Sequence, residues 1–306
     1  SETWRMGEEI VRENVGNIFE ESEGAIIFDG EKYGLHKRVF ITAQGLTTYE
    51  AKEIGLAMLK KDRSPSDLYV MTTAVEQEEY FKVVKKAIEL IDPYFEGRLK
   101  HVPHGMMQLT SGKMSSRSGN VVTGESLIEN AQEVAAKKVS ERVEGDATSE
   151  LIDMIAVAGI KFNILKQRVS KNIAYDPDTA ISFEGDSGPY LQYTYARCKS
   201  VIEKAKEQNI KSVTDGVVCD KSQDIEKLLA QFGEVVERSS NEYASHHVAN
   251  YVLELAHEYN AYYAENIIVD IKNPELSAYR VAVTVATAQV IKNALMLLGI
   301  RVPEQM

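Results

Sequence analysis

The chain has 306 residues, a formal net charge of −11, and 44% hydrophobic and 26% charged residues. This composition is typical of a globular protein and excludes a disordered or fibrous chain, and the length predicts two domains. The acidic charge argues against a protein that simply coats nucleic acid, although a specific RNA partner could still bind to a local basic face.

The first half of the sequence alternates short apolar runs with helical patterns. Strand-length runs of β-branched and aromatic residues occur in GAIIF near Gly24, in RVFIT at 38–42 and in LYVMT at 68–72. Apolar residues at helical spacing follow at 48–61 and 76–91. The alternation of strand and helix predicts parallel pairing through right-handed crossovers, with ligands at the carboxyl ends of the strands.

The second half of the sequence is predicted to be helical. A further strand is expected in RLKHVPHGMM at 98–107, and Thr123 is expected to cap a helix that ends near Gly145. From about Thr148 onward only helical patterns remain, and we predict no strand there. The fold class is therefore α/β plus all-α, with a helical bundle that begins after a boundary between 140 and 180.

Two classes of site are excluded by what the sequence does not contain. No run of about 18 apolar residues occurs, so we expect a cytoplasmic protein without a membrane partner. The two cysteines, Cys198 and Cys219, lack metal-ligand spacing, and we expect reduced thiols and no bound metal.

The segment GKMSSRSGN, at 112–120, concentrates one lysine, one arginine and three serine hydroxyls between two glycines. It is not a P-loop, because Met114 rather than Ser or Thr follows Lys113, and Met107 stands five residues before Gly112. Two interpretations remain from composition alone. The segment is either a solvated polar loop, or a flexible loop whose lysine closes over a triphosphate and stabilises the departing pyrophosphate.

The sequence KMSSR closely resembles the KMSKS loop of class I aminoacyl-tRNA synthetases, in the KMS-x-R-x-GN form found in arginyl-tRNA synthetases. Segments that resemble the same family are spread over nearly the whole chain: FDGEKYGLHKRVFITAQGLTTYEAKEIG, HVPHGMMQLTSGKMSSRSGNVVTGESL, SFEGDSGPYLQYTYARCKSV and IKNALMLLGIRVPEQM. The resemblance implies the C-terminal half of a Rossmann-type catalytic domain in 1–135, connecting helices in 136–178, and a helical anticodon-binding domain of the DALR type in 179–306.

The resemblance implies that Tyr49, Glu53 and Gln77 bind the substrate arginine. TYEAKE matches a family motif like TYxTRD, with Glu53 in place of aspartate and Lys52 in place of arginine. The residues themselves support part of this role, because a spacing of four puts Tyr49 and Glu53 on one helix face and a carboxylate can form a bidentate pair with a guanidinium. Without the resemblance, an acidic first turn of a helix and a solvated glutamine would explain the same residues.

The resemblance also implies an ATP site. His104, Gly105 and Met106 match the segment that binds adenine, largely through backbone groups. The loop residues implied to stabilise the triphosphate are Lys113, Ser115, Ser116 and Arg117. We expect ATP with Mg²⁺ as a substrate and no bound metal or organic cofactor.

HVPHG is not the HIGH motif of these enzymes, because Pro103 occupies the glycine position and the segment lies directly before the lysine loop. No H-x-G-H occurs among the six histidines. The resemblance therefore implies the C-terminal portion of a longer synthetase, without the HIGH-motif half of the catalytic domain. We expect this portion to have little or no activity by itself.

The helical half is implied to bind tRNA, whose splayed anticodon bases stack on aromatic rings. The implied contacts are Tyr190, Tyr193, Arg197, Tyr259, Asn260 and Met306, and Tyr195 and Tyr263 are further aromatic candidates. Tyrosines at spacings of three and four are more often core residues, so that alternative remains open for each of them.

The resemblance implies that the full enzyme is an arginine-tRNA ligase. It would join arginine to ATP as arginyl-adenylate and transfer the arginyl group to tRNA(Arg), and we expect a monomer. An alternative from another class is a non-catalytic tRNA-binding module from a truncated synthetase. A different nucleotidyltransferase that shares only the lysine loop would leave the similarity in the helical half unexplained.

Overall fold

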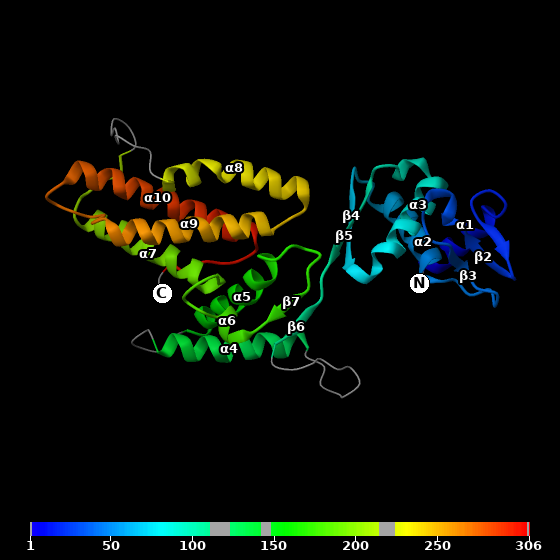
Figure 1. Cartoon of the computed structure of the whole chain (residues 1–306), viewed down its shortest axis with the longest axis horizontal. Coiled ribbons are helices and arrows are strands. Elements are labelled where there is room, and N and C mark those ends of the chain that lie inside the picture. The colour runs from blue at the N-terminus through cyan, green and yellow to red at the C-terminus, as the bar shows by residue number, and fades with distance from the viewer. Residues whose placement is uncertain (1, 111–122, 142–147, 214–223, 305) are drawn as a thin grey trace. The chain divides into compact units, whose positions relative to one another are not determined.

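The computed structural model describes residues 2–110, 123–141, 148–213, 224–304 and 306 (Figure 1). The chain divides into two compact units, Ser1–Met106 and Met107–Met306. The division into 1–135, 136–178 and 179–306 follows the resemblance rather than compactness and stays a prediction. In the part of the chain that is described, no helix is both long and apolar enough to cross a membrane.

The first unit contains an antiparallel sheet of the order β1-β2-β3. The strands are β1 (Glu20–Ser22), β2 (Ala25–Phe28) and β3 (Arg38–Ile41), so the apolar runs near Gly24 and at 38–42 do form strands. The prediction that the second of these pairs in parallel with the strand at 68–72 is wrong. The link from β2 to β3 is too short for a crossover, so the chain returns antiparallel.

A parallel βαβ unit follows, as the alternation of patterns predicts. β4 (Tyr69–Ala74) pairs in parallel with β5 (Leu99–His104), and the helix between them is α3 (Glu78–Ile91), preceded by the short helix η2 (Val75–Gln77). The ladder runs in register from Tyr69 opposite Leu99 to Ala74 opposite His104. The carboxyl ends of the two strands therefore meet at one edge of the sheet, where such folds bind ligands.

Two glycines hold α1 (Glu2–Glu13) close to α2 (Tyr49–Arg63). A Cβ atom added at Gly7 would lie 1.9 Å from the carbonyl oxygen of Ala51, and one added at Gly55 would lie 2.1 Å from the carbonyl oxygen of Thr3. No side chain larger than hydrogen fits at either position. This close packing fixes α2, the helix that carries Tyr49 and Glu53.

The second unit contains a short parallel sheet that the sequence did not predict. β6 (Met107–Leu109) pairs with β7 (Ile173–Tyr175), so the expectation of no strand after Thr148 is wrong. The single strand expected at 98–107 is in fact β5 and β6, and these two strands belong to different sheets. A three-residue strand is too short to show a periodicity of two in sequence.

Helices make up the remainder of the second unit. Those that precede the bundle are α4 (Gly124–Ser140), α5 (Ser149–Leu165) and α6 (Pro177–Ala180), and those of the bundle are α7 (Gly188–Glu207), α8 (Asp224–Glu242), α9 (His246–Glu265) and α10 (Pro274–Leu297). Thr123 caps α4 in a reciprocal capping box with Ser126, as expected, but α4 ends at Ser140 rather than near Gly145.

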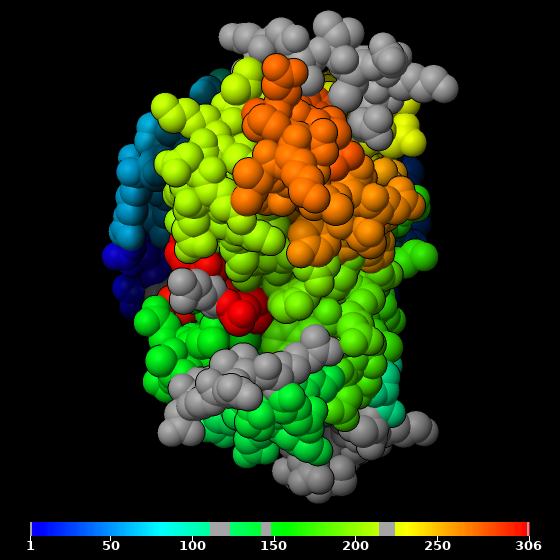
Figure 2. All heavy atoms as spheres, turned by 90° about the vertical axis from the view of Figure 1, so that its left-hand side faces the viewer, coloured from blue at the N-terminus to red at the C-terminus, as the bar shows by residue number. Residues whose placement is uncertain are grey.

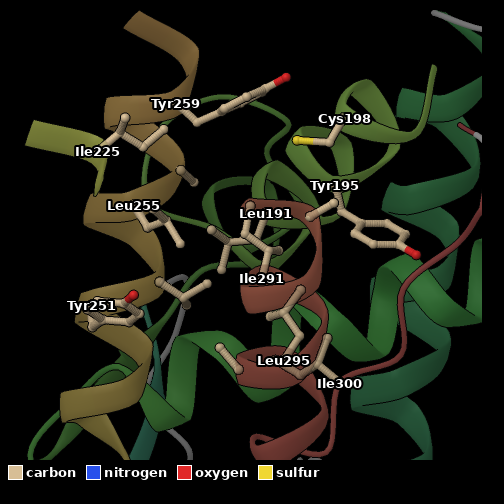
Figure 3. Close-up of a cluster of buried hydrophobic side chains, with 14 of the residues drawn as sticks. Leu191, Tyr195, Cys198, Ile225, Tyr251, Leu255, Tyr259, Ile291, Leu295 and Ile300 are labelled. Atoms are coloured by element: carbon tan, nitrogen blue, oxygen red, sulfur yellow. The ribbon is translucent and has the colours of Figure 1, made fainter. Parts of the chain in front are cut away.

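The four helices of the bundle lie side by side around one core (Figure 1). Its buried members shown in Figure 3 include Leu191, Tyr195, Cys198, Ile225, Tyr251, Leu255, Tyr259, Ile291, Leu295 and Ile300. Gly299 has a φ of +67° directly after α10, where the chain turns back through hydrogen bonds of Gly299 and Ile300 to the last turn of the helix. The terminal residues thereby run back along the bundle.

Candidate functional site

A cleft of about 550 Å³ lies at the carboxyl end of β4, beside the first turns of α2 and α3. It is lined by Arg38, Tyr49, Glu50, Glu53, Thr73, Ala74, Glu76, Gln77, Tyr80 and Phe81. The structure therefore brings together all three residues predicted to bind arginine. The cleft has the size and position of a small-molecule site in an α/β fold.

Glu53 is a partly buried carboxylate in the cleft. Its side chain is half-buried, and burial raises its pKa, while the charge of Lys60 acts in the opposite direction. No cationic side chain in the described part of the chain forms an ion pair with it. A carboxylate taken out of water without a partner favours the binding of a cation, because the ligand restores the interactions that burial removed.

The neighbouring Glu50 differs from Glu53 because it is already paired. Its side chain is buried, and its Oε1 lies 3.6 Å from Nη1 of Arg38 on β3. The Arg38 guanidinium also lies 5.8 Å from the centre of the Tyr80 ring. Burial, then the charges of Glu53 and Glu50, raise the pKa of Tyr80, so its phenol stays neutral and can donate a hydrogen bond.

The other two predicted arginine ligands line the same cleft but are more exposed. Tyr49 is 76% exposed, and its ring carries the Lys52 ammonium at 5.0 Å from the ring centre. Gln77 is also exposed, at the end of η2. Their side chains are thus free to move onto a ligand, and their roles in arginine binding stay predictions.

The segment implied to bind adenine ends β5. His104 lies opposite Ala74 in the ladder, and its Nδ1 is 2.9 Å from the carbonyl oxygen of Gly105. Met106 is 45% exposed. These residues stand at the ligand-binding edge of the sheet, whereas the loop residues Lys113, Ser115, Ser116 and Arg117 lie outside the described residues. No group of three or more possible metal ligands occurs in the described ranges.

Arg197 of α7 is enclosed by aromatic rings and an amide. Its guanidinium lies 5.0 Å from the centre of the Tyr193 ring and 5.2 Å from that of Tyr263, and it donates a hydrogen bond to Oδ1 of Asn260. Asn260 Nδ2 in turn donates to the Tyr190 hydroxyl at 2.8 Å. Four residues predicted to bind RNA therefore form one network, together with Tyr263.

This network opens into a recess of about 370 Å³ in the second unit. The recess is lined by Tyr193, Ala196, Arg197, Ser200, Val201, Lys204, Tyr263 and Met306. Lys204 follows Arg197 by seven residues, which places both on the same face of α7. Lys204 was not among the predicted residues, although this spacing could have indicated it. In the same way Tyr80, three residues after Gln77 on α3, was missed in the first cleft.

Two tyrosines offered as RNA contacts belong to the core instead. Tyr259 is fully buried, its hydroxyl donates to Oγ1 of Thr284 at 3.4 Å, and burial raises its pKa (Figure 3). Tyr195 is 2% exposed, and burial raises its pKa to about 12. Neither ring has a free face for a base, so we remove both from the candidate RNA surface.

Two family profiles match this chain. The profile described as "tRNA synthetases class I (R), catalytic domain" matches residues 5–176, which include the cleft at β4, and the one described as "DALR anticodon binding domain" matches residues 191–306, which include the recess. The class is thus a class I aminoacyl-tRNA synthetase. Because the catalytic profile covers more than half of the chain, the chain belongs to the arginyl-tRNA synthetase family.

Individual proteins agree with this assignment. An arginine-tRNA ligase of Parabacteroides distasonis is 31% identical over 100% of this chain and 53% of its own length, and one of Bacteroides fragilis is 32% identical with the same coverage. The chain spans about half the length of the curated relatives it matches. The structure of Thermus thermophilus arginyl-tRNA synthetase superposes with a TM-score of 0.82 at 23% identity, over 99% of this chain and 58% of that one, and shows the same fold.

Proposed function

We propose that this chain is the C-terminal portion of an arginine-tRNA ligase, in which the cleft at β4 binds the arginine side chain. The observation that carries the proposal is the half-buried, unpaired Glu53 carboxylate in a cleft that Tyr49 and Gln77 also line. A planar guanidinium fits such a carboxylate bidentately, which lysine cannot do. Glu50 does not compete for this role because Arg38 already neutralises it.

The proposed chemistry is that of the family, and it is supported by the position of the cleft at the carboxyl end of β4. Arginine held by Glu53 would present its carboxylate to the α-phosphate of ATP, bound by His104, Gly105 and Met106 with Mg²⁺. The carboxylate oxygen attacks phosphorus, and pyrophosphate leaves with its charge stabilised by the lysine loop. A terminal ribose hydroxyl of tRNA(Arg) then attacks the arginyl carbonyl and releases AMP, without a covalent enzyme intermediate.

The second unit would supply the tRNA contacts. Tyr193 and Tyr263 are aromatic surfaces on which an unpaired anticodon base can stack, and Arg197 and Lys204 place positive charge where a phosphate would lie. In this proposal the full enzyme acts as a cytoplasmic monomer. The local positive charge explains how a chain of net charge −11 can bind RNA.

The test is binding of this chain to an arginine tRNA and to the same tRNA with a replaced anticodon, over a salt series. We expect the replaced anticodon to weaken binding by about tenfold, the effect of losing one or two stacked and hydrogen-bonded bases. Equal affinity for the two tRNAs at every salt concentration would contradict anticodon reading by the second unit.

A second candidate function is a tRNA-binding module without catalysis. It is favoured by one observation, the absence of an H-x-G-H sequence from these 306 residues. Both candidates predict little arginine-dependent exchange of pyrophosphate into ATP by this chain alone, so they differ instead in arginine binding at the cleft, which only the ligase requires. We expect this chain alone to show little exchange, and robust exchange would contradict both the module and the need for a further ATP-binding half.

A further inference from the structure

The carboxylate of Glu304 is contacted by side chains from two helices. The Tyr195 hydroxyl donates to its Oε1 at 3.1 Å, Nζ of Lys199 lies 3.0 Å from its Oε2, and Nζ of Lys292 lies 3.6 Å from its Oε1. Tyr195 and Lys199 belong to α7, and Lys292 belongs to α10. The hydrogen bond from Lys199, with the other two partners, lowers the pKa of Glu304.

The chain just before Glu304 is also fixed. Nε2 of the fully buried Gln192 donates to the carbonyl oxygen of Arg301 at 2.7 Å, and the Arg301 guanidinium pairs with Asp153 on α5 at 3.1 Å. Lys161, also on α5, donates to the carbonyl oxygen of Gly299 at 2.5 Å. Side chains of α5 and α7 thus hold the backbone from Gly299 to Arg301.

Beyond Glu304 the chain reaches the recess. Met306 is half-buried, lines the recess beside Arg197 and Tyr193, and packs against the core formed by α4, α5 and β7. Figure 2 shows the terminal residues, in red, between the yellow-green chain of α7 and the green helices α4 and α5. Met306 thus lies between the recess and this core.

We propose that Glu304 is a positioning residue, whose contacts with Tyr195, Lys199 and Lys292 hold the C-terminal methionine in the recess before RNA binds. This inference rests on the proposed function of the recess as an RNA contact. An isolated surface ion pair contributes little, but here three donors from two helices meet one carboxylate. A tail that is already in place avoids the entropy cost of being ordered on binding, which would otherwise reduce the affinity.

The first arm of the test needs no RNA. With ¹³C-methyl methionine, the Met306 methyl resonance is assigned by its loss in Met306→Ala, among the nine methionines of the chain. We expect Glu304→Gln to shift this resonance toward its random-coil position and to leave the other eight unchanged. Glu203→Gln is the matched control, because Glu203 is a similarly exposed glutamate of α7 that pairs with Lys206. An unmoved Met306 resonance in Glu304→Gln would overturn the proposal.

The second arm measures affinity for the arginine tRNA. We expect Glu304→Gln to weaken binding by about tenfold, because only about a tenth of the molecules then hold Met306 in place, and Glu203→Gln to change it less than twofold. Met306→Ala should weaken binding similarly, and the double variant should be no weaker than either single one. A released tail with unchanged tRNA affinity would overturn the positioning role. Failure of the unsubstituted chain to bind tRNA would instead overturn the proposed function, and the methyl arm would still decide whether Glu304 holds Met306.

Discussion

The cleft of the first unit holds the Glu53 carboxylate near two tyrosines, and the recess of the second holds the Arg197 guanidinium between two tyrosines, but only Arg197 has its charge compensated by its neighbours. Arg197 is enclosed by the rings of Tyr193 and Tyr263 and hydrogen-bonded to Asn260. Glu53 has its pKa raised by burial and no cationic partner within the described ranges. The cleft therefore lacks a cationic partner for Glu53, whereas Arg197 in the recess already has its contacts within the protein.

This difference follows from the ligands that each site would take. A small cationic ligand would itself pair with the Glu53 carboxylate. Without the ligand the carboxylate stays unpaired and lowers the stability of the fold. A base that stacks brings no charge to neutralise, and it binds best to rings that are already held in place. Substitutions at Glu53 and at Arg197 change the two sites separately.

The largest effect is expected from Glu53→Gln, which removes the unmet charge. Arginine binding, measured by calorimetry, should weaken by about 100-fold, because two charge-assisted hydrogen bonds to the guanidinium are lost. The thermal stability of the unliganded chain at pH 7 should rise, because an uncompensated buried charge disappears. Glu76→Gln is the matched control in the same cleft, since Glu76 is exposed. An equal loss of affinity in both variants would mean that the cleft acts only through its overall negative field.

The pH dependence of arginine binding gives a second, graded test of the same charge. Burial raises the pKa of Glu53 above 4.5, so the carboxylate is protonated at a higher pH than an exposed glutamate. Arginine affinity should therefore fall as pH drops through this raised pKa, by about tenfold for each pH unit below it. In the unliganded protein the sign is opposite: ionised Glu53 destabilises the fold above its raised pKa, and the penalty vanishes below 4.5. A midpoint of binding at or below 4.5 would contradict a desolvated Glu53.

On the side of the recess, Arg197→Lys keeps the charge but loses the planar group that lies between two rings. We expect tRNA affinity to fall roughly fivefold, because stacking and the hydrogen bond to Asn260 both depend on the guanidinium. The slope of affinity against salt should stay the same, since the charge remains. Lys204→Met is the converse variant, and it should reduce the slope. Unchanged tRNA affinity in Arg197→Lys would mean that Arg197 acts as a simple counter-charge and not through its planar group.

The sequence predicted the local elements better than their pairing. The runs at β2, β3 and β4 were found because β-branched and aromatic residues mark strands locally. The partner predicted for β3 was wrong because the connection that precedes β3 is too short for a crossover and lets β3 pair antiparallel with β2. β7 was missed because its three residues carry no periodicity.

For the cleft, spacing along α2 and the resemblance together predicted Tyr49 and Glu53, and the resemblance alone predicted Gln77; the structure brings all three into one cleft. Nothing in the sequence predicted that Glu50 is neutralised while Glu53 is not. That distinction depends on Arg38, which lies on β3 of the antiparallel sheet and pairs with Glu50 of α2. Charge compensation between distant segments is a property of the fold and has no local signal.

Tyr259 shows that residue spacing in the helical half does not predict which tyrosines are exposed. Its substitution is expected to have the smallest effect on tRNA affinity. Tyr259 and Tyr263 are separated by one turn of α9, yet the first is fully buried and the second is 39% exposed. Tyr259→Phe should leave tRNA affinity within twofold and lower the free energy of unfolding by about 1 kcal/mol or less, the value of one neutral hydrogen bond. Tyr263→Leu should do the reverse, weakening tRNA binding with little effect on stability. Both are measured by denaturant unfolding and by tRNA titration. A loss of tRNA binding in Tyr259→Phe, with stability unchanged, would return that hydroxyl to the RNA surface and show that α9 moves when RNA binds.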